Sequence, residues 1–163
     1  MKIIEMIYFL SSGGAERFVV DLSNELARKG HDVTIMTLKD DCKDSRNRKF
    51  YCGEIADNVK YMNLGLPDGN SLSIQMKVYQ AIKKLNPNVV HLHLVNTPLY
   101  AFYAIMRLHK KIKFVETMHN SISTNYNGII RRMLFSTIGK MKWLQFVCLS
   151  QTNFEEMKAI HPY

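Results

Sequence analysis

The chain has 163 residues, of which 47% are hydrophobic and 22% are charged, a balance that suits one globular domain with a sizeable core and excludes a disordered chain. Its formal net charge of +8 predicts a surface that attracts anions such as phosphorylated ligands or anionic lipid. Nucleic acid is the least favoured of these partners, because aromatic residues are not interleaved with the basic ones as a base-stacking surface requires.

The sequence also bears on the cellular compartment. Its first residues run directly into a strand pattern without a signal peptide, and no apolar stretch approaches the roughly 20 residues of a membrane span. Cys42, Cys52 and Cys148 have neither a disulfide framework nor zinc-knuckle spacing, so reduced thiols are expected. We therefore expect a cytoplasmic protein.

Apolar runs alternate with helical periodicities along the chain. Strands are predicted by the apolar runs at residues 3–10, 33–38, 59–64, 89–94, 113–118 and 143–149. Helices are predicted from residue 15 to Gly30, from 74 to 85, after Pro98, from 130 to 141 and after a cap at Thr152 or Asn153. This alternation predicts a single α/β domain, Rossmann-like and doubly wound, with a mostly parallel sheet and helices on both faces.

Residues 40–58 differ from the rest of the chain because they are polar and have no clear period. They carry a basic cluster of Lys43, Arg46, Arg48 and Lys49. The segment therefore predicts a solvated, poorly ordered loop.

The turn at residues 11–16, with the sequence Ser-Ser-Gly-Gly-Ala-Glu, joins the first strand to the first helix. Gly13 and Gly14 predict a tight turn with positive φ, and they let a ligand approach the main chain. The free N–H groups of the following helix favour an anion such as phosphate. The pattern is neither the dinucleotide fingerprint nor the Walker loop, and a purely structural turn is the alternative.

Several polar side chains are expected at the same edge of the sheet as this turn. If the strand order is 3-2-1-4-5-6, ligands bind beyond the carboxyl ends of the strands, where the order reverses between strands one and four. The side chains expected to share this crevice with Gly13 and Gly14 are His93, Asn96, His119 and Ser150. His119 is the strongest candidate, because a histidine between a strand and a polar loop favours recognition or proton chemistry.

A metal site is a weaker interpretation of the same histidines. His91 and His93 point to one face of a strand and, with His119, are an alternative three-histidine zinc site. No carboxylate is evident at the strand ends to complete it, which also argues against a phosphoacceptor aspartate. We expect no metal, and we favour a buried His91 paired with backbone.

Five short motifs occur in order along nearly the whole chain: GGAER at residues 13–17, LARKGHDV at 26–33, NVVHLH at 88–93, ETMHN at 116–120 and CLS at 148–150. Each is short, but together they lie on the matching predicted elements. In this combination they resemble the N-terminal domain of family 4 glycosyltransferases of the GT-B fold.

The resemblance implies that residues 1–163 are the acceptor-side domain and that a C-terminal nucleotide-sugar-binding domain is absent, so this fragment alone is expected to be inactive. It implies a hexosyltransferase-like enzyme that moves a sugar, with retention, from a nucleotide sugar to a glycan or lipid-linked acceptor, without a further cofactor. Gly13 and Gly14 would face the donor diphosphate or the transferred sugar. His119 would contact that sugar and stabilise an oxocarbenium-like transition state. The residues implied to line the cleft are His93, Asn96, Asn120 and Ser150.

Two other functions stay open: a non-catalytic module that binds a phosphorylated or sugar ligand at Gly13 and Gly14, and a histidine-ligated metal hydrolase.

The resemblance also implies a membrane-held acceptor in many members. Residues 130–141 have an apolar face bordered by Arg131, Arg132, Lys140 and Lys142. This face is a candidate for peripheral contact with the inner face of an anionic membrane. The alternative is that this face packs on the sheet.

Overall fold

A computed structural model describes residues 1–39, 50–94, 97–119 and 136–160 of the chain. In these ranges the strands form one parallel sheet of order β3-β2-β1-β4-β5-β6, which confirms the predicted doubly wound order. The strands are β1 (Lys2–Ile7), β2 (Asp32–Thr37), β3 (Lys60–Asn63), β4 (Val89–His93), β5 (Lys113–Met118) and β6 (Gln145–Cys148). The order reverses between β1 and β4, so the carboxyl ends of these two strands mark the expected ligand edge.

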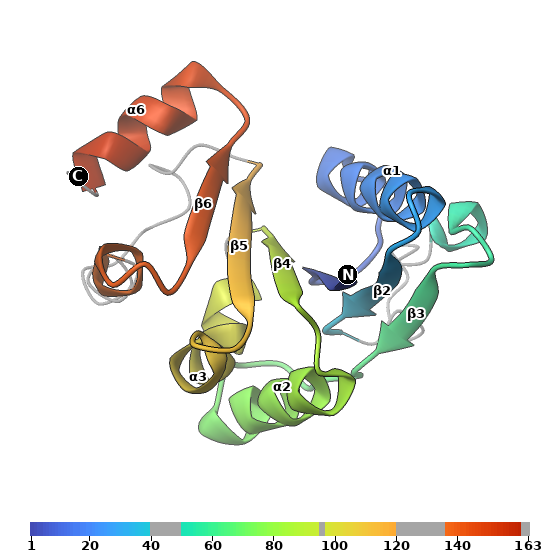
Figure 1. Cartoon of the computed structure of the whole chain (residues 1–163), viewed down its shortest axis with the longest axis horizontal. Coiled ribbons are helices and arrows are strands. Elements are labelled where there is room, and N and C mark those ends of the chain that lie inside the picture. The colour runs from blue at the N-terminus through green and yellow to red at the C-terminus, as the bar shows by residue number, and fades with distance from the viewer. Residues whose placement is uncertain (40–49, 95–96, 120–135, 161–163) are drawn as a thin grey trace.

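Helices cover both faces of this sheet (Figure 1). They are α1 (Gly14–Arg28), α2 (Leu72–Leu85), α3 (Thr97–Leu108) and α6 (Gln151–Ile160), and residues 136–140 are also helical. The larger core joins the central strands to α2 and α3, and the smaller core joins β1 and β2 to α1. No helix within the described ranges is long and apolar enough to cross a membrane.

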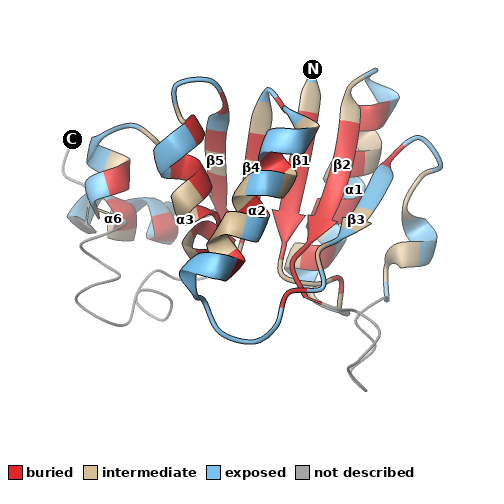
Figure 2. Cartoon of the chain, turned by 90° about the horizontal axis from the view of Figure 1, so that it is seen from below, coloured by how far each residue is buried: buried red, intermediate tan, exposed pale blue. Residues whose placement is uncertain are grey.

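The two cores follow from the alternation of side chains along β1. Ile4 and Met6 are fully buried in the larger core, whereas Ile7 belongs to the core beneath α1. The central strands are therefore buried on both sides, as their red colour in Figure 2 shows. This explains why they read as continuous apolar runs rather than as alternating patterns.

The start and end of the helices follow from local chemistry. α1 ends at a left-handed Gly30 with φ of +84°, and the N–H of His31 donates to the carbonyl of Leu26. α2 begins at Ser71, whose hydroxyl accepts from the N–H of Ile74. It ends at Asn86, which has a φ of 47° and precedes Pro87.

The structure corrects three of the predicted boundaries. β1 ends at Ile7 rather than at residue 10, and the carbonyl of Leu10 instead accepts from the N–H of Phe50. Part of the segment predicted to be a loop forms a short 3-10 helix, η1 (Cys52–Glu54), held against α1 because Asn24 donates to the carbonyl of Glu54. Residues 40–49 with their basic cluster lie outside the described residues.

The third correction concerns the last helix. Its cap is Ser150, whose hydroxyl accepts from the N–H of Asn153, and not Thr152 or Asn153. Asn153 instead turns inward and donates to the carbonyl of Met118, with 7% of its surface exposed. The end of β5 is thereby tied to the start of α6.

Candidate functional site

The carboxyl edge of the sheet brings together the turn before α1 and the ends of β4 and β5. Phe18 of α1 packs against both histidines of these strands, with ring centroids 5.9 Å from His93 and 5.3 Å from His119. Phe18 thus brings the predicted crevice residues His93 and His119 against α1, the helix that begins at Gly14. Asn96 and Asn120 lie outside the described residues.

The turn at Gly13 has a different conformation from the predicted one. Gly13 caps α1 in an extended conformation, with φ of −87° and ψ of 163°, so the expectation of positive φ at this turn is wrong. The glycine is needed for space instead, since a Cβ at this position would lie 2.2 Å from Oε2 of Glu16. The hydroxyl of Ser11 donates to the other oxygen of Glu16 at 2.8 Å and helps to hold this carboxylate in the first turn.

Gly14 has the opposite surroundings. Among the residues that the structure describes, a Cβ at Gly14 would meet nothing within 4 Å, and Gly14 is exposed. The helix N-terminus thus has a closed side, where Glu16 already supplies a negative charge, and an open side at Gly14. Backbone N–H groups on the open side are available to a ligand.

His93 and His119 form a pair at the ends of β4 and β5. Nδ1 of His93 lies 3.1 Å from Nε2 of His119. His93 is fully buried, so its imidazole does not reach the surface and can act on a ligand only through His119, which is partly exposed. The prediction that both rings line a cleft is therefore corrected for His93.

A carboxylate that the sequence interpretation missed lies behind this pair. Oε2 of Glu5, in the middle of β1, lies 2.6 Å from Nε2 of His93 and 3.0 Å from Nδ1 of His91. Nε2 of His91 lies 2.7 Å from the hydroxyl of Thr117. His91 is thus paired with side chains and not with backbone, which corrects that expectation. The signal for Glu5 was a single charge within the apolar run at residues 3–10, because a charge buried there needs a partner.

Burial and hydrogen bonding set the protonation of this cluster. Burial alone raises the pKa of the Glu5 carboxyl, but hydrogen bonds from His91 and His93 outweigh it, and the net pKa lies below the usual value. Burial lowers the pKa of His93, against the opposing effect of Glu5. Burial, with the neighbouring His93 and His91, lowers the pKa of His119 to about 4. At neutral pH the cluster therefore contains an ionised Glu5 and neutral His93 and His119.

The same cluster includes the residues of the zinc alternative. Ligand atoms of Glu5, His91 and His93 lie within 4.8 Å of one another. In a tetrahedral zinc site, metal bonds of 2.0–2.2 Å would separate ligand atoms by about 3.3 Å. The Glu5–His93 separation of 2.6 Å is shorter and is that of a charge-assisted hydrogen bond. Hydrogen bonds thus account for the arrangement of Glu5, His91 and His93.

A buried lysine lies at the same edge, after β2. Lys39 is 3% exposed, and its Nζ donates to the carbonyl of Pro67 and lies 3.0 Å from Oδ1 of Asp68. The ammonium also lies 5.6 Å and 5.9 Å from the ring centroids of Tyr8 and Tyr100. This arrangement satisfies the charge internally and ties β2 to the segment that precedes α2.

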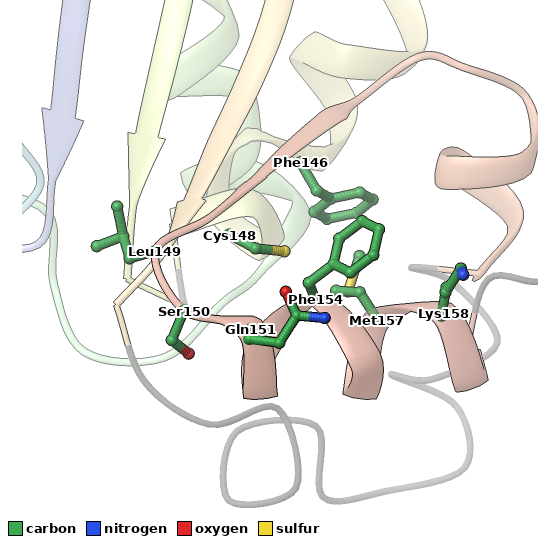
Figure 3. Close-up of a pocket in the computed structure, with 8 residues that line it drawn as sticks. All are labelled: Phe146, Cys148, Leu149, Ser150, Gln151, Phe154, Met157 and Lys158. Carbon is green, nitrogen blue, oxygen red and sulfur yellow. The ribbon is translucent and has the colours of Figure 1, made fainter.

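Ser150 lies farther along the edge, beside a groove between β6 and α6. The groove has a volume of about 470 Å³ and is shown in Figure 3. The lining residues are Phe146, Cys148, Leu149, Ser150, Gln151, Phe154, Met157 and Lys158. Since the Ser150 hydroxyl is engaged as the cap of α6, its first role is structural. Its predicted contact with a ligand stays a prediction.

The fold is a Rossmann-like α/β domain whose carboxyl edge carries a glycine turn and a partly exposed histidine. The chain belongs to Glycosyltransferase Family 4, because residues 12–162 match the model of that family. It is 27% identical over 135 residues to an uncharacterized glycosyltransferase of Haemophilus influenzae, covering 80% of this chain and 34% of that protein.

Solved structures show the same fold at lower identity. A lipopolysaccharide outer core galactosyltransferase matches with a TM-score of 0.65 and 17% identity, over 98% of this chain and 42% of its own. The sucrose-phosphate synthase of Thermosynechococcus elongatus matches with a TM-score of 0.58 and 15% identity, over 85% of this chain and 40% of its own. The chain thus spans about a third to two fifths of the length of these relatives.

Proposed function

We propose that this chain is the acceptor-side domain of a retaining glycosyltransferase that uses a nucleotide-sugar donor and a glycan or lipid-linked acceptor. The observation that carries the proposal is the exposed start of α1 at Gly14, on the helix whose Phe18 packs against the neutral, partly exposed His119. Family membership supports glycosyl transfer. A structural relative described as an alpha-glucosyltransferase in complex with UDP supports a nucleotide donor.

The chemistry of the two groups suits a sugar diphosphate. Backbone N–H groups at the open side of α1 would donate to oxygen atoms of the transferred sugar or of the diphosphate, whose negative charge grows as the glycosidic bond breaks. A neutral His119 adds no positive charge beside an oxocarbenium-like centre, and its ring can accept a hydrogen bond from a sugar hydroxyl. Both groups thus favour the transition state.

The length of the relatives explains how a complete enzyme would be built. We propose that the partner half of the donor site lies in a second domain, as the family resemblance implies, and that residues 1–163 alone do not turn over. Full-length gene product and the 163-residue chain would be compared in the same assay. Equal activity of the two forms would contradict this division of the site.

The test is a donor-hydrolysis assay on the full-length gene product with a panel of nucleotide sugars, with and without a metal chelator. Wild type is compared with His119→Ala and Gly14→Val. We expect one donor to be consumed, the chelator to have no effect, and each variant to lose about 100-fold or more in kcat/KM. His109→Ala is the matched control, since this histidine follows α3 at the opposite edge and stacks on Trp143.

A second pair of variants separates the two glycines. A Cβ at Gly14 meets open space, so Gly14→Ala should fold normally and lose donor affinity. Gly13→Ala must displace the Glu16 carboxylate and should lower the urea midpoint as well. If no donor is consumed but a sugar phosphate binds wild type and not Gly14→Val, the non-catalytic binding module replaces the enzyme as the proposed function.

A further inference from the structure

The donor and the acceptor of each hydrogen bond from Glu5 to His93 and from His93 to His119 can be assigned in only one way when Glu5 is ionised and both rings are neutral. An ionised Glu5 only accepts, so His93 must carry its proton on Nε2, which donates to Oε2 of Glu5. A neutral His93 then presents Nδ1 as an acceptor, and His119 must carry its own proton on Nε2. The remaining atom, Nδ1 of His119, makes no hydrogen bond in the described part of the chain.

We propose that Glu5 is a positioning residue that, through His93, fixes the tautomer and orientation of His119 and keeps its Nδ1 as an acceptor for a hydroxyl of the donor sugar. The inference rests on the proposed role of His119. According to this proposal, Glu5 of the buried strand β1 contributes to the site at His119, the residue that follows β5. Glu5 touches no ligand and acts only through His93.

Packing makes the chain of groups rigid. Glu5 and His93 have no exposed surface, and the side chain of His91 is 13% exposed. His91 supports Glu5 from the side, because its Nδ1 approaches the same carboxylate oxygen and its Nε2 contacts Thr117. Phe18 closes the cluster from α1. With its ring held on one side, His119 has one polar atom, Nδ1, that contacts no hydrogen-bond partner among the described residues.

A purely structural role for Glu5 is a poor explanation of this geometry. Its other carboxylate oxygen, Oε1, has no hydrogen-bond partner within the described residues, so burying the charge is costly. Apolar side chains in place of Glu5 and its two histidine partners together would avoid that cost. The carboxylate does something that an apolar residue cannot, which is to accept two N–H groups and thereby impose the direction of the proton chain.

The first test determines the tautomers of His93 and His119 directly. Long-range ¹H–¹⁵N spectra of the 163-residue chain at pH 7 would assign protonated and unprotonated nitrogens of His93 and His119. We expect Nε2 protonated and Nδ1 unprotonated in both rings. A His119 that carries its proton on Nδ1, or a charged His119 ring, would overturn the proposal. This reading does not depend on any enzymatic activity.

The second test removes the acceptor. Glu5→Met keeps the side-chain volume and should leave His119 as a mixture of tautomers, while Glu116→Met is the matched control. Glu116 is also a fully buried carboxyl, but it lies on the opposite face of β5 from Thr117 and should not affect His119. If Glu5→Met does not fold, Glu5→Gln removes the charge with less change of shape. An unaltered His119 tautomer in the variant that folds would overturn the proposal.

Kinetics of the full-length gene product complete the test. We expect Glu5→Met to lower kcat by about 10- to 100-fold with a smaller change in KM for the nucleotide sugar. Equal losses in Glu5→Met and Glu116→Met would overturn the positioning role. If wild type consumes no nucleotide sugar while the tautomers are as expected, the proposed function fails and the hydrogen-bond chain stands.

Discussion

The lowered pKa of His119 keeps its ring neutral at pH 7 and makes its protonation costly to the folded protein in acid. Burial lowers the pKa of His119 to about 4 in the folded state, against about 6.5 in an unfolded chain. Below pH 6.5 the unfolded state therefore binds more protons, and stability is lost as the pH falls from 6.5 towards 4.

We predict that wild type loses about 1 kcal/mol of unfolding free energy through this group between pH 7.5 and 5, after allowing for its partial exposure. His119→Gln should lose less over the same interval. Urea unfolding of wild type and His119→Gln at pH 7.5 and pH 5 measures how much unfolding free energy each protein loses. A direct NMR titration of His119 near pH 6.5 would contradict the prediction.

Glu116 is a second buried carboxyl, with surroundings opposite to those of Glu5. Neither of its oxygens has a hydrogen-bond partner within the described residues, and burial raises the pKa of this group well above its usual value. Because the folded state holds the proton, the stability from this group is present below about pH 4.5. It is lost as the pH rises from there towards the folded-state pKa.

We therefore predict that Glu116→Leu raises the unfolding free energy at pH 7 by about 1–3 kcal/mol, since it removes an unpaired buried polar group. The gain should shrink at pH 4.5, where the folded-state carboxyl is neutral and about half of the unfolded-state carboxyl is protonated as well. Glu5→Leu, which removes a paired carboxylate, should destabilise instead. Urea midpoints of the three proteins at both pH values distinguish these outcomes, and a loss of stability in Glu116→Leu would refute the account.

At the scale of elements, the hydroxyl of Ser150 caps α6 at its junction with β6. Ser150 caps α6 through the N–H of Asn153, and Asn153 reaches back to Met118 at the end of β5. We predict that Ser150→Ala costs about 1 kcal/mol and that Ser150→Asp, which can still accept, costs less. Ser71→Ala at the cap of α2 is the matched comparison.

The outcome for Ser150 bears on its proposed contact with a ligand. Thermal unfolding measures the stability of each variant, and donor turnover of the full-length protein measures its function. If Ser150→Asp keeps both, the hydroxyl acts as a cap alone. If it keeps stability and loses turnover, the residue also contacts the ligand.

The elements themselves were largely predictable from the sequence. Continuous apolar runs such as that of β1 are typical of strands buried on both faces, and Gly30 marked the end of α1 by its need for positive φ. The site was predictable only in part. His119 follows from its place after β5, but the link from Glu5 to His93 joins residues 88 positions apart and depends on strand register.

The errors have physical causes. Gly13 and Gly14 were expected to form a tight turn with positive φ because both lack a Cβ. Neither has positive φ, and the glycine at position 13 instead leaves space for the Glu16 carboxylate. Glu5 was not predicted, because it lies inside β1 rather than at a strand end and contacts His119 only through His93. Such contacts are not visible in periodicity.

At the scale of the whole molecule, the net charge of +8 bears on membrane contact. Within the helix at residues 136–140 and the turn that follows, Ile138 is buried in the larger core, while Met141, Lys140 and Lys142 are exposed. The described part of the candidate face is thus divided between the core and the surface. We propose that its exposed part contacts anionic lipid.

We predict that the full-length protein binds vesicles containing phosphatidylserine and that binding weakens with salt. Reversing both charges, with Lys140→Glu and Lys142→Glu, should weaken binding by about tenfold or more. Reversing Lys110 and Lys111, an exposed pair after α3, is the control for net charge alone. Vesicle sedimentation measures both, and equal losses in the two double variants would contradict a specific membrane face.

The Glu5–His93–His119 connection also has a consequence for how the chain folds. It spans β1, β4 and β5, strands that become neighbours only when distant parts of the sequence have come together. Parallel sheets of this kind order slowly, because long loops must close before their strands can pair. The ring of His119 acquires its unusual acidity only when the centre of the sheet is complete. Its ¹⁵N signal during refolding would therefore report when β1, β4 and β5 have come together.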